Sequence, residues 1–453
     1  MKIVLAINAG SSSVKVSVYQ AEGRGSAPVR LAEAQVSGLT APPARLTYDR
    51  GGVPVHRGKD VSAAGISTQR DAFVLLLDTL VGDEGLAQVR SRGDVALACH
   101  GGDYASSQLI TPSTLHHLSA LSDLAPLHNG PALDIVRSCL GPEADGNGDS
   151  NSNTGGGGDA GLLPRAANVA CFDTQFHASI PPHVRTYPID QTVARANGLR
   201  KYGFHGLSYS FVTRAAAAHL GKPEPSTSLV ALHLGSGASA CAVRSGRSAD
   251  TSMGLTPLAG LPGATRSGTL DPSLVFHYAS DVGRLSPAST SHLHISLAEE
   301  ILNKRAGWSA LAGTTDFAAI TSAAQDPKSN PQAALAFDLF VDRVSAFVGS
   351  YFVSLRGEVD ALVFAGGIGE KSPRLRAAVV DQVSCLGFTL DPSRNDADGP
   401  DDGSTVWDIG APGSAHRVLV CRTDEQYEMA RDGVSREDVW SSSPSSLPSS
   451  STT

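Results

Sequence analysis

The order of hydrophobic and polar residues predicts a β-hairpin at the start of the chain. Residues 3–7 are all apolar and predict a buried strand, and residues 14–19 predict a second strand. The segment 8–13 between them holds small and hydroxyl-bearing residues that suit a tight turn. Gly10 allows a close backbone approach, N–H and hydroxyl groups there can donate to phosphate oxygens, and Lys15 adds a positive charge. The hairpin is therefore a candidate phosphate site, although such turns also occur without a ligand.

The same pattern recurs in the middle of the chain. Residues 229–243 repeat the order of apolar strand, Gly/Ser turn and apolar strand, with the turn at 235–239. An internal repeat of this length indicates two similar halves. We therefore expect two α/β domains that each present a phosphate-type turn to an interdomain cleft, where a nucleotide would bind.

Two further segments show helical periodicity, and a third is a short apolar run. Apolar residues at helical spacing over 71–81 and 331–351 predict helices that face a core. Residues 360–365 predict a buried strand that runs into the glycine loop 366–370 and then a helix. A strand, a glycine loop and a helix N-terminus form a geometry that contacts nucleotides, although glycine loops also serve packing.

Two segments cannot bury a core. Residues 141–161 are nearly all Gly, Asn, Asp and Ser, and residues 441–453 are rich in Ser, Pro and Thr, so we expect a disordered insertion and a disordered tail. The ordered parts predict an N-terminal domain of 1–175 plus about 415–436, and a nucleotide-binding domain of 176–414.

Composition narrows the functional classes. The chain has 453 residues, enough for two cores, and its net charge of −8 argues against a nucleic-acid binder. Its six cysteines are scattered without a Cys-x-x-Cys pair, which predicts reduced thiols. No apolar run reaches membrane-spanning length, so we expect a cytoplasmic protein without a membrane partner.

One long loop stands out between these elements. Residues 250–272 are punctuated by glycine and proline and contain a single arginine, Arg266. Long ordered loops are more often functional than not. The alternative is that Arg266 is an ordinary surface arginine without a role in function.

Eight short motifs together resemble the acetate kinase family. They are Asn8-Ala-Gly-Ser-Ser-Ser, His100-Gly-Gly, Leu124-Ala-Pro-Leu-His-Asn129, Phe172-Asp-Thr-x-Phe-His177, Tyr202-Gly-Phe-His-Gly206, Asp250-Thr-Ser-Met-Gly254, Gly-Ile-Gly-Glu370 and Asp424-Glu425. They occur in the family's order over nearly the whole chain. The resemblance implies the duplicated βββαβαβα core shared with sugar kinases and actin-like ATPases. It further implies reversible phosphoryl transfer between ATP and acetate, giving acetyl phosphate and ADP, with Mg²⁺ or Mn²⁺, in a homodimer.

The resemblance also implies the catalytic residues. In-line phosphoryl transfer requires positioning and charge neutralisation more than covalent help. Arg266 and His205 match the family's transition-state arginine and histidine, and Asp173 matches its essential carboxylate. The alternatives are a structural histidine and an aspartate that caps the following turn.

Binding residues follow from the same resemblance. Asn8 and Glu425 match the Mg²⁺ positions and offer the hard oxygen donors that Mg²⁺ prefers. Lys15 matches the ATP-contacting lysine. The nucleotide-binding segments match His233, Leu234, Gly235, Ser236, Gly237, Asp316, Phe317, Ala318, Gly367, Ile368, Gly369, Glu370 and Lys371.

The chain departs from the family pattern at one arginine. The family usually reads His-Arg-Val-Val-His-Gly-Gly, whereas residues 95–102 read Val-Ala-Leu-Ala-Cys-His-Gly-Gly. Without a gap Leu97 occupies the place of the arginine, and with a short gap His100 starts the motif and four residues are missing. The loss of a cationic ligand of the transition state would cost several kcal/mol in activation free energy. Tyr209 also stands where a second histidine is common. Because of the missing arginine, one alternative to an acetate kinase is a catalytically impaired homologue that binds nucleotide. A propionate or butyrate kinase is the other, because acyl-chain length depends on a pocket volume that the sequence does not show.

Overall fold

The computed structural model describes most of the chain. The described residues are 1–9, 13–39, 43–66, 68–102, 107–111, 114–115, 126–140, 161–278, 284–286, 289, 296–397, 399–400 and 403–441. The tip of the first hairpin turn lies outside these residues. The predicted insertion and tail lie almost wholly outside them as well.

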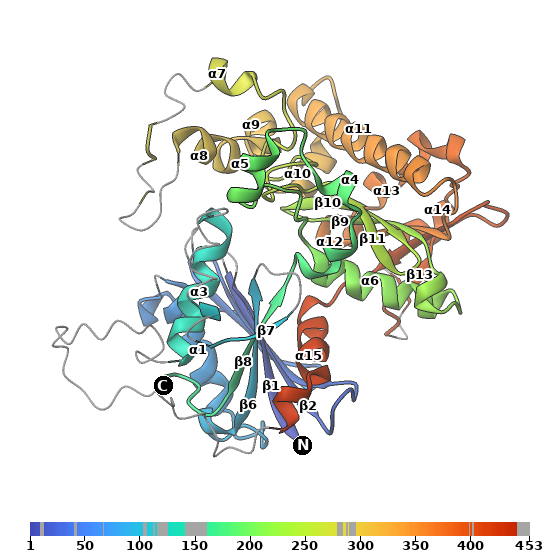
Figure 1. Ribbon diagram of the computed structural model, residues 1–453. Coiled ribbons are helices and arrows are strands. Elements are labelled where there is room, and N and C mark those ends of the chain that lie inside the picture. The colour runs from blue at the N-terminus through green and yellow to red at the C-terminus, as the bar shows by residue number, and fades with distance from the viewer. Residues whose placement is uncertain are drawn as a thin grey trace. The chain divides into compact units, whose positions relative to one another are not determined.

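The first unit is built on an eight-stranded sheet in the order β5-β4-β3-β2-β1-β6-β8-β7. The strands are β1 Lys2–Ala9, β2 Ser13–Ala21, β3 Val29–Ser37, β4 Arg45–Arg50, β5 Val53–Asp60, β6 Val95–Gly102, β7 Gln108–Leu109 and β8 Ala167–Phe172. β1, β6 and β8 run parallel, and β1 and β2 form the predicted hairpin. Helices α1 (Gln69–Val81) and α3 (Pro126–Leu140) cover one face, and α15 (Glu425–Ser435) covers the other (Figure 1).

The second unit is built on a six-stranded sheet in the order β11-β10-β9-β12-β14-β13. The strands are β9 Leu229–Leu234, β10 Ala238–Arg244, β11 Arg247–Thr251, β12 Ala361–Ala365, β13 Val406–Asp408 and β14 Arg417–Cys421. Its larger helices are α6 Gly206–His219, α8 Leu297–Lys304, α11 Pro331–Ser354 and α13 Pro373–Gln382. Its shorter helices are α4 Pro182–Arg185, α5 Gln191–Ala196, α7 Leu274–Tyr278, α9 Gly307–Ala312, α10 Phe317–Ala323, α12 Gly366–Lys371 and α14 Pro392–Asp396, and α16 Glu437–Ser441 follows α15.

The two sheets share one topology, which confirms the predicted duplicated α/β core. In the first sheet the order β3-β2-β1-β6-β8 corresponds to β11-β10-β9-β12-β14 in the second, with the last three strands parallel in both. After β8 the chain leads to α6, which packs on the second sheet. After β14 it forms α15, which packs on the first sheet. The chain therefore crosses between the units twice.

The units divide the chain at residues 175/176 and 424/425. The second crossing was expected near residue 415, but β14 pairs in parallel with β12 and antiparallel with β13. Residues 417–421 therefore belong to the second unit, and the expected boundary was about ten residues too early.

Core packing follows the hydrophobic pattern. The stripe on α11 faces the core, with Phe340 and Val344 at most 1% exposed. Each fully buried side chain of this size contributes roughly 1.5–3 kcal/mol. All six cysteines are free thiols, as expected, and only Cys385 is exposed. Within the described part of the chain, no helix is both long and apolar enough to cross a membrane.

Candidate active site

The predicted metal residues lie together in the first unit. Asn8 is near the end of β1, and its amide Nδ2 donates to Oε2 of Glu425, the first residue of α15, at 3.1 Å. Lys15 lies opposite Asn8 on β2, and its Nζ is 3.0 Å from Oε1 of Glu33. The described residues contain no cluster of three or more His, Cys, Asp or Glu side chains that could hold a metal. An amide oxygen and a carboxylate suit an ion that keeps most of its ligands as water and phosphate, as Mg²⁺ does.

Asp173 also belongs to the first unit. It follows β8 directly and is half-buried. Ligands of α/β sheets bind beyond the carboxyl ends of the parallel strands, and β8 is one of the three parallel strands here. Asp173 therefore lies at the carboxyl end of a parallel strand, where ligands of such sheets generally bind.

His205 has an unusual backbone in the second unit. It precedes α6 with φ 59° and ψ 24°, the left-handed region that is unfavourable for residues with a side chain. Its Nδ1 is 2.8 Å from Oγ of the buried Ser239, and that oxygen is 2.5 Å from the hydroxyl of Tyr209. The ring is therefore fixed at Nδ1, by groups on β10 and α6.

A second histidine stacks on His205. The ring centroids of His205 and His233 are 4.2 Å apart with an interplanar angle of 28°. His233 Nδ1 is 2.8 Å from Oγ of Ser208, which is 2.9 Å from Oγ1 of Thr423. Removal from water lowers the pKa of His233 to about 4, so this ring is neutral at physiological pH.

Arg266 meets His205 at the second phosphate-type turn. A Cβ atom placed on Gly237 would lie 3.2 Å from Arg266 Nη1 and 3.7 Å from His205 Nε2. Within the described residues the Arg266 guanidinium has no hydrogen bond or ion pair, and burial lowers its pKa. A shielded cation without a carboxylate, beside a histidine and a glycine turn, is suited to bind an anion.

The segment predicted as a glycine loop after β12 is the short helix α12, and it packs on β9, the strand that leads into the same turn. Gly366 has φ 76°, and a Cβ there would lie 2.8 Å from the carbonyl oxygen of Leu234. Glu370 Oε1 accepts from the backbone N–H of Thr423 at 3.4 Å, and burial raises the pKa of Glu370. The backbone carbonyls of Gly369 and Glu370 accept from the buried Arg376 at 3.0 and 2.6 Å. This arginine holds the end of α12.

The predicted segment 316–318 has a partly structural role. Asp316 caps α10, since its Oδ1 accepts from the backbone N–H groups of Ala318 and Ala319. Phe317 is 5% exposed and packs edge-on against Trp308 and Phe340. Only the backbone of Phe317 is left to contact a ligand, whereas Ala318 is exposed.

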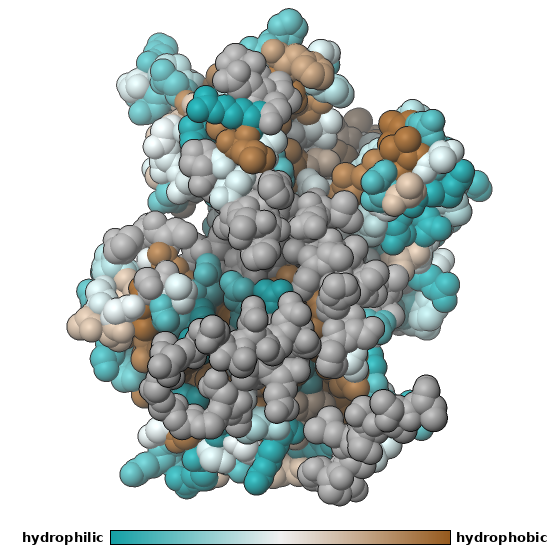
Figure 2. Space-filling view, turned by 60° about the vertical axis from the view of Figure 1, so that its left-hand side comes forward, coloured by the Kyte–Doolittle hydropathy of each residue, from teal (hydrophilic) through white to brown (hydrophobic). Residues whose placement is uncertain are grey.

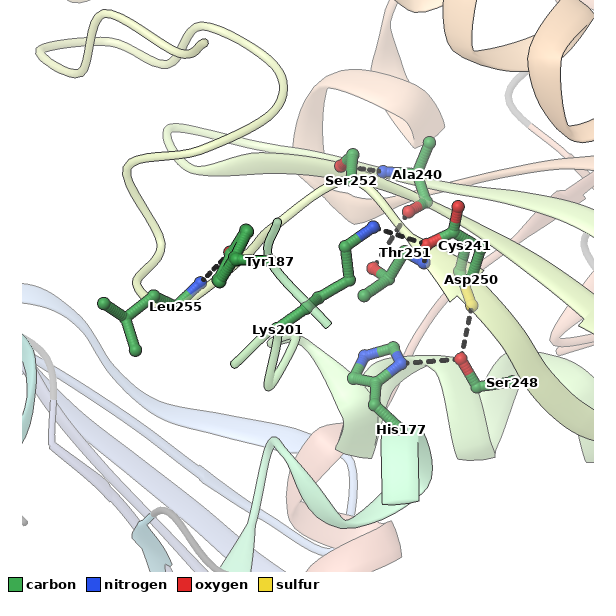
Figure 3. A network of polar contacts seen from close by, with 10 residues as sticks. All are labelled: His177, Tyr187, Lys201, Ala240, Cys241, Ser248, Asp250, Thr251, Ser252 and Leu255. Atoms are coloured by element: carbon green, nitrogen blue, oxygen red, sulfur yellow. Dashed lines mark hydrogen bonds and ion pairs between the residues drawn. The ribbon is translucent and has the colours of Figure 1, made fainter. Parts of the chain in front are cut away.

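Sequence reasoning missed the polar network beneath His205. Figure 3 shows Lys201 directed at Asp250, with Nζ 2.6 Å from Oδ1, and His177 directed at Ser248. His177 and Asp250 were part of quoted motifs, but nothing in the sequence gave their partners.

Comparison with known proteins identifies related sequences. The model of the acetokinase family matches residues 3–142 and 158–431. A probable acetate kinase from Chaetomium globosum is 55% identical, over 97% of this chain and 99% of the relative. One from Neurospora crassa is 54% identical, over 97% and 95%.

Solved structures are similar as well. The acetate kinase of Porphyromonas gingivalis has a TM-score of 0.73 at 28% identity, over 96% of this chain and 99% of the other. A propionate kinase from Francisella tularensis has a TM-score of 0.75 at 28% identity, over 95% and 99%. The described fold is thus shared with these kinases over nearly the full length.

Proposed function

The chain belongs to the acetokinase family, and on that premise we propose that it transfers a phosphoryl group reversibly between ATP and acetate, giving acetyl phosphate and ADP. The observation that carries the proposal is the convergence of Arg266 and His205 on the turn at Gly237. A cation and an imidazole on one glycine turn can neutralise the charge that spreads over a transferring phosphoryl group.

The residues of the chain take distinct parts in this reaction. Arg266 binds equatorial oxygens of the transferring group through its planar fork, and His205 donates from Nε2 to the same group. Asp173 orients the acetate end or a water molecule. Asn8 and Glu425 would hold Mg²⁺, which neutralises phosphate charge when bound. Lys15, the turn at 235–237 and residues 367–371 of α12 bind the nucleotide.

The absent arginine bears on the rate. If the family's arginine is aligned with Leu97 without a gap, its place is taken by a side chain that is fully buried in the sheet. We propose that turnover is consequently below that of an ordinary kinase. A nucleotide-binding homologue without turnover is the limiting case.

A single assay tests the proposed function. Purified protein is supplied with ATP, Mg²⁺ and acetate, and acetyl phosphate is trapped as the hydroxamate. A variant with Arg-Val-Val-His inserted after His100 is assayed beside it. Activity in either protein supports the kinase, and a much faster insertion variant supports the role of the arginine. Calorimetric binding of ATP without turnover in either protein would favour the nucleotide-binding homologue.

Propionate is the second candidate substrate, because the Francisella tularensis neighbour is a propionate kinase. The ratio of kcat/KM for acetate and propionate decides between them. A methylene in an apolar pocket changes this ratio by about 10–200-fold. A ratio in favour of propionate would replace acetate in the proposal.

We also propose a homodimer, supported by apolar surface on the second unit. Phe276 and Tyr278 on α7 are 71% and 56% exposed. Figure 2 shows one face of the molecule, on which brown groups lie among teal ones. Near α7 lies an apolar cavity of about 300 Å³. Its lining includes Leu274, Leu302, Leu311, Leu339 and Phe340. The mass in solution from light scattering tests this, and a monomer would refute it.

The unpaired thiols support a cytosolic location.

A further inference from the structure

His177 lies beneath the turn that carries His205, and its two ring nitrogens have different partners. It is 4% exposed, with Nε2 3.0 Å from the carbonyl oxygen of Phe204 and Nδ1 2.8 Å from Oγ of Ser248. A carbonyl can only accept, so Nε2 carries the hydrogen and Nδ1 accepts from the serine hydroxyl. The thiol of Cys241 in turn donates to the Ser248 hydroxyl oxygen, at a distance of 3.5 Å.

The bond to Phe204 acts on the residue next to the catalytic one. Gly203 and His205 both have positive φ, 80° and 59°. A Cβ on Gly203 would lie 2.7 Å from the His177 ring and 2.5 Å from the Thr251 methyl group, so the turn rests directly on these side chains. A left-handed residue with a side chain persists only where its surroundings determine the backbone.

Other contacts hold the turn on its far side. The backbone N–H groups of Tyr202 and Gly203 donate to the carbonyl of Gly254, and the ion pair of Lys201 with Asp250 secures the two segments (Figure 3). These bonds end at Gly203. The bond from His177 Nε2 reaches the next residue along the turn, Phe204. Burial lowers the pKa of His177 to about 4, so its neutral donor form persists at physiological pH.

We propose that His177 is a positioning residue: its Nε2–H fixes the Phe204 carbonyl and thereby the left-handed backbone that aims His205 at the transferring phosphoryl group. The inference rests on the proposed function, because it needs His205 to contact that group. It adds a residue that acts only through the backbone.

Two substitutions of His177 distinguish the role of its hydrogen-bond donor from the role of the ring's packing. In His177→Gln the side-chain nitrogen can occupy the position of Nε2 and donate to Phe204, whereas in His177→Asn the shorter amide reaches only the position of Nδ1. Thr213→Val is the control: its hydroxyl is buried in α6 and donates only to the carbonyl of Tyr209, so it removes a buried hydrogen bond without touching Phe204.

The measurements are kcat, KM and the imidazole signals of His205 in ¹⁵N-histidine-labelled protein. We expect kcat of His177→Asn to fall by about 100-fold, as for a small misplacement of a catalytic group. KM should stay within about twofold, since a contact made in the transition state is lost. His177→Gln should recover kcat to within about threefold of the parent. The His205 signals should move in the asparagine variant, and stay in the glutamine variant and in Thr213→Val.

Several outcomes would overturn the proposal. Equal losses of kcat in the asparagine and glutamine variants would show that only the ring's packing matters. Unmoved His205 signals in the asparagine variant would show that the two histidines are uncoupled. If the asparagine variant does not fold, the parent spectrum decides, because a proton on Nδ1 of His177 contradicts the proposal. If the parent does not phosphorylate acetate, the proposed function fails, while the His205 signals still test the coupling.

Discussion

The substitution Gly237→Ala tests whether the phosphates pass the second Gly/Ser turn. Gly237 has no positive φ that an alanine would strain. The new methyl carbon would lie 3.2 Å from Arg266 Nη1 and 3.7 Å from His205 Nε2. Because the guanidinium is the end of a flexible side chain, it can yield by a few tenths of an ångström. We therefore expect a loss of folding stability below about 1 kcal/mol.

The effect on catalysis should be much larger. A phosphate oxygen held by Arg266 must approach a guanidinium nitrogen to about 2.8 Å, which is close to the place that the methyl group takes. Loss of one such contact to the transition state costs about 10²–10³ in kcat, or roughly 3–4 kcal/mol. Activation free energy should therefore change several times more than the free energy of unfolding.

Hydroxamate assays and urea unfolding of the same preparation give both quantities. Gly349→Ala is the matched control, because no atom of the described residues lies within 4 Å of its new methyl group inside α11. It should leave kcat unchanged and add about 1 kcal/mol of stability. Parental kcat and ATP affinity in Gly237→Ala would refute the assignment of this turn to the phosphates.

Three further predictions concern other parts of the molecule. Glu425→Gln removes the carboxylate of the proposed metal site. In a Mg²⁺ titration of activity, the Mg²⁺ concentration for half-maximal activity should be about 10–100-fold higher than in the parent; an unchanged titration would exclude Glu425 as a ligand. Arg376→Met leaves the carbonyls of Gly369 and Glu370 without their donor, so urea unfolding should show a loss of about 2–4 kcal/mol. Burial lowers the pKa of His100 to about 4 from 6.5. The unfolded state then takes up the proton first as the pH falls, so stability is full above pH 6.5 and declines towards pH 4, by about 3 kcal/mol from this group. His100→Gln should flatten the dependence of the urea midpoint on pH; an unaltered slope would show that His100 does not cause it.

The hairpins and the repeat could be predicted because they depend on local pattern. The strand at 3–7 is a continuous apolar run, and the strand at 229–234 is apolar except for His233. Both lead into Gly/Ser turns, and such runs are buried in parallel sheets whatever lies further along the chain. The stripe on α11 has helical period and faces the core for the same reason. The boundary near 415 was wrong because the pairing of β14 is set by β12, more than fifty residues earlier.

The parts of the site that escaped prediction depend on long-range partners. His177 and Ser248 are separated by 71 residues, and Ser208 and Thr423 by 215. No periodicity encodes such pairs. Phe317 was grouped with nucleotide-binding residues by its motif, and only the packing of three aromatic rings around it assigns its side chain to the core.

The connection from β14 to α15 joins, along the polypeptide, the contacts of the histidine pair in the second unit and the proposed metal site in the first. Thr423 is bound in the second unit, because its hydroxyl contacts Ser208, the partner of His233, and its N–H donates to Glu370. Glu425, two residues later, begins the helix that packs on the first sheet and contacts Asn8. Two residues span at most about 7 Å between Cα atoms. The chain therefore passes within two residues from the contacts of Thr423 in the second unit to the proposed metal ligand in the first, and a substitution at Thr423 should affect the metal dependence and the nucleotide affinity together.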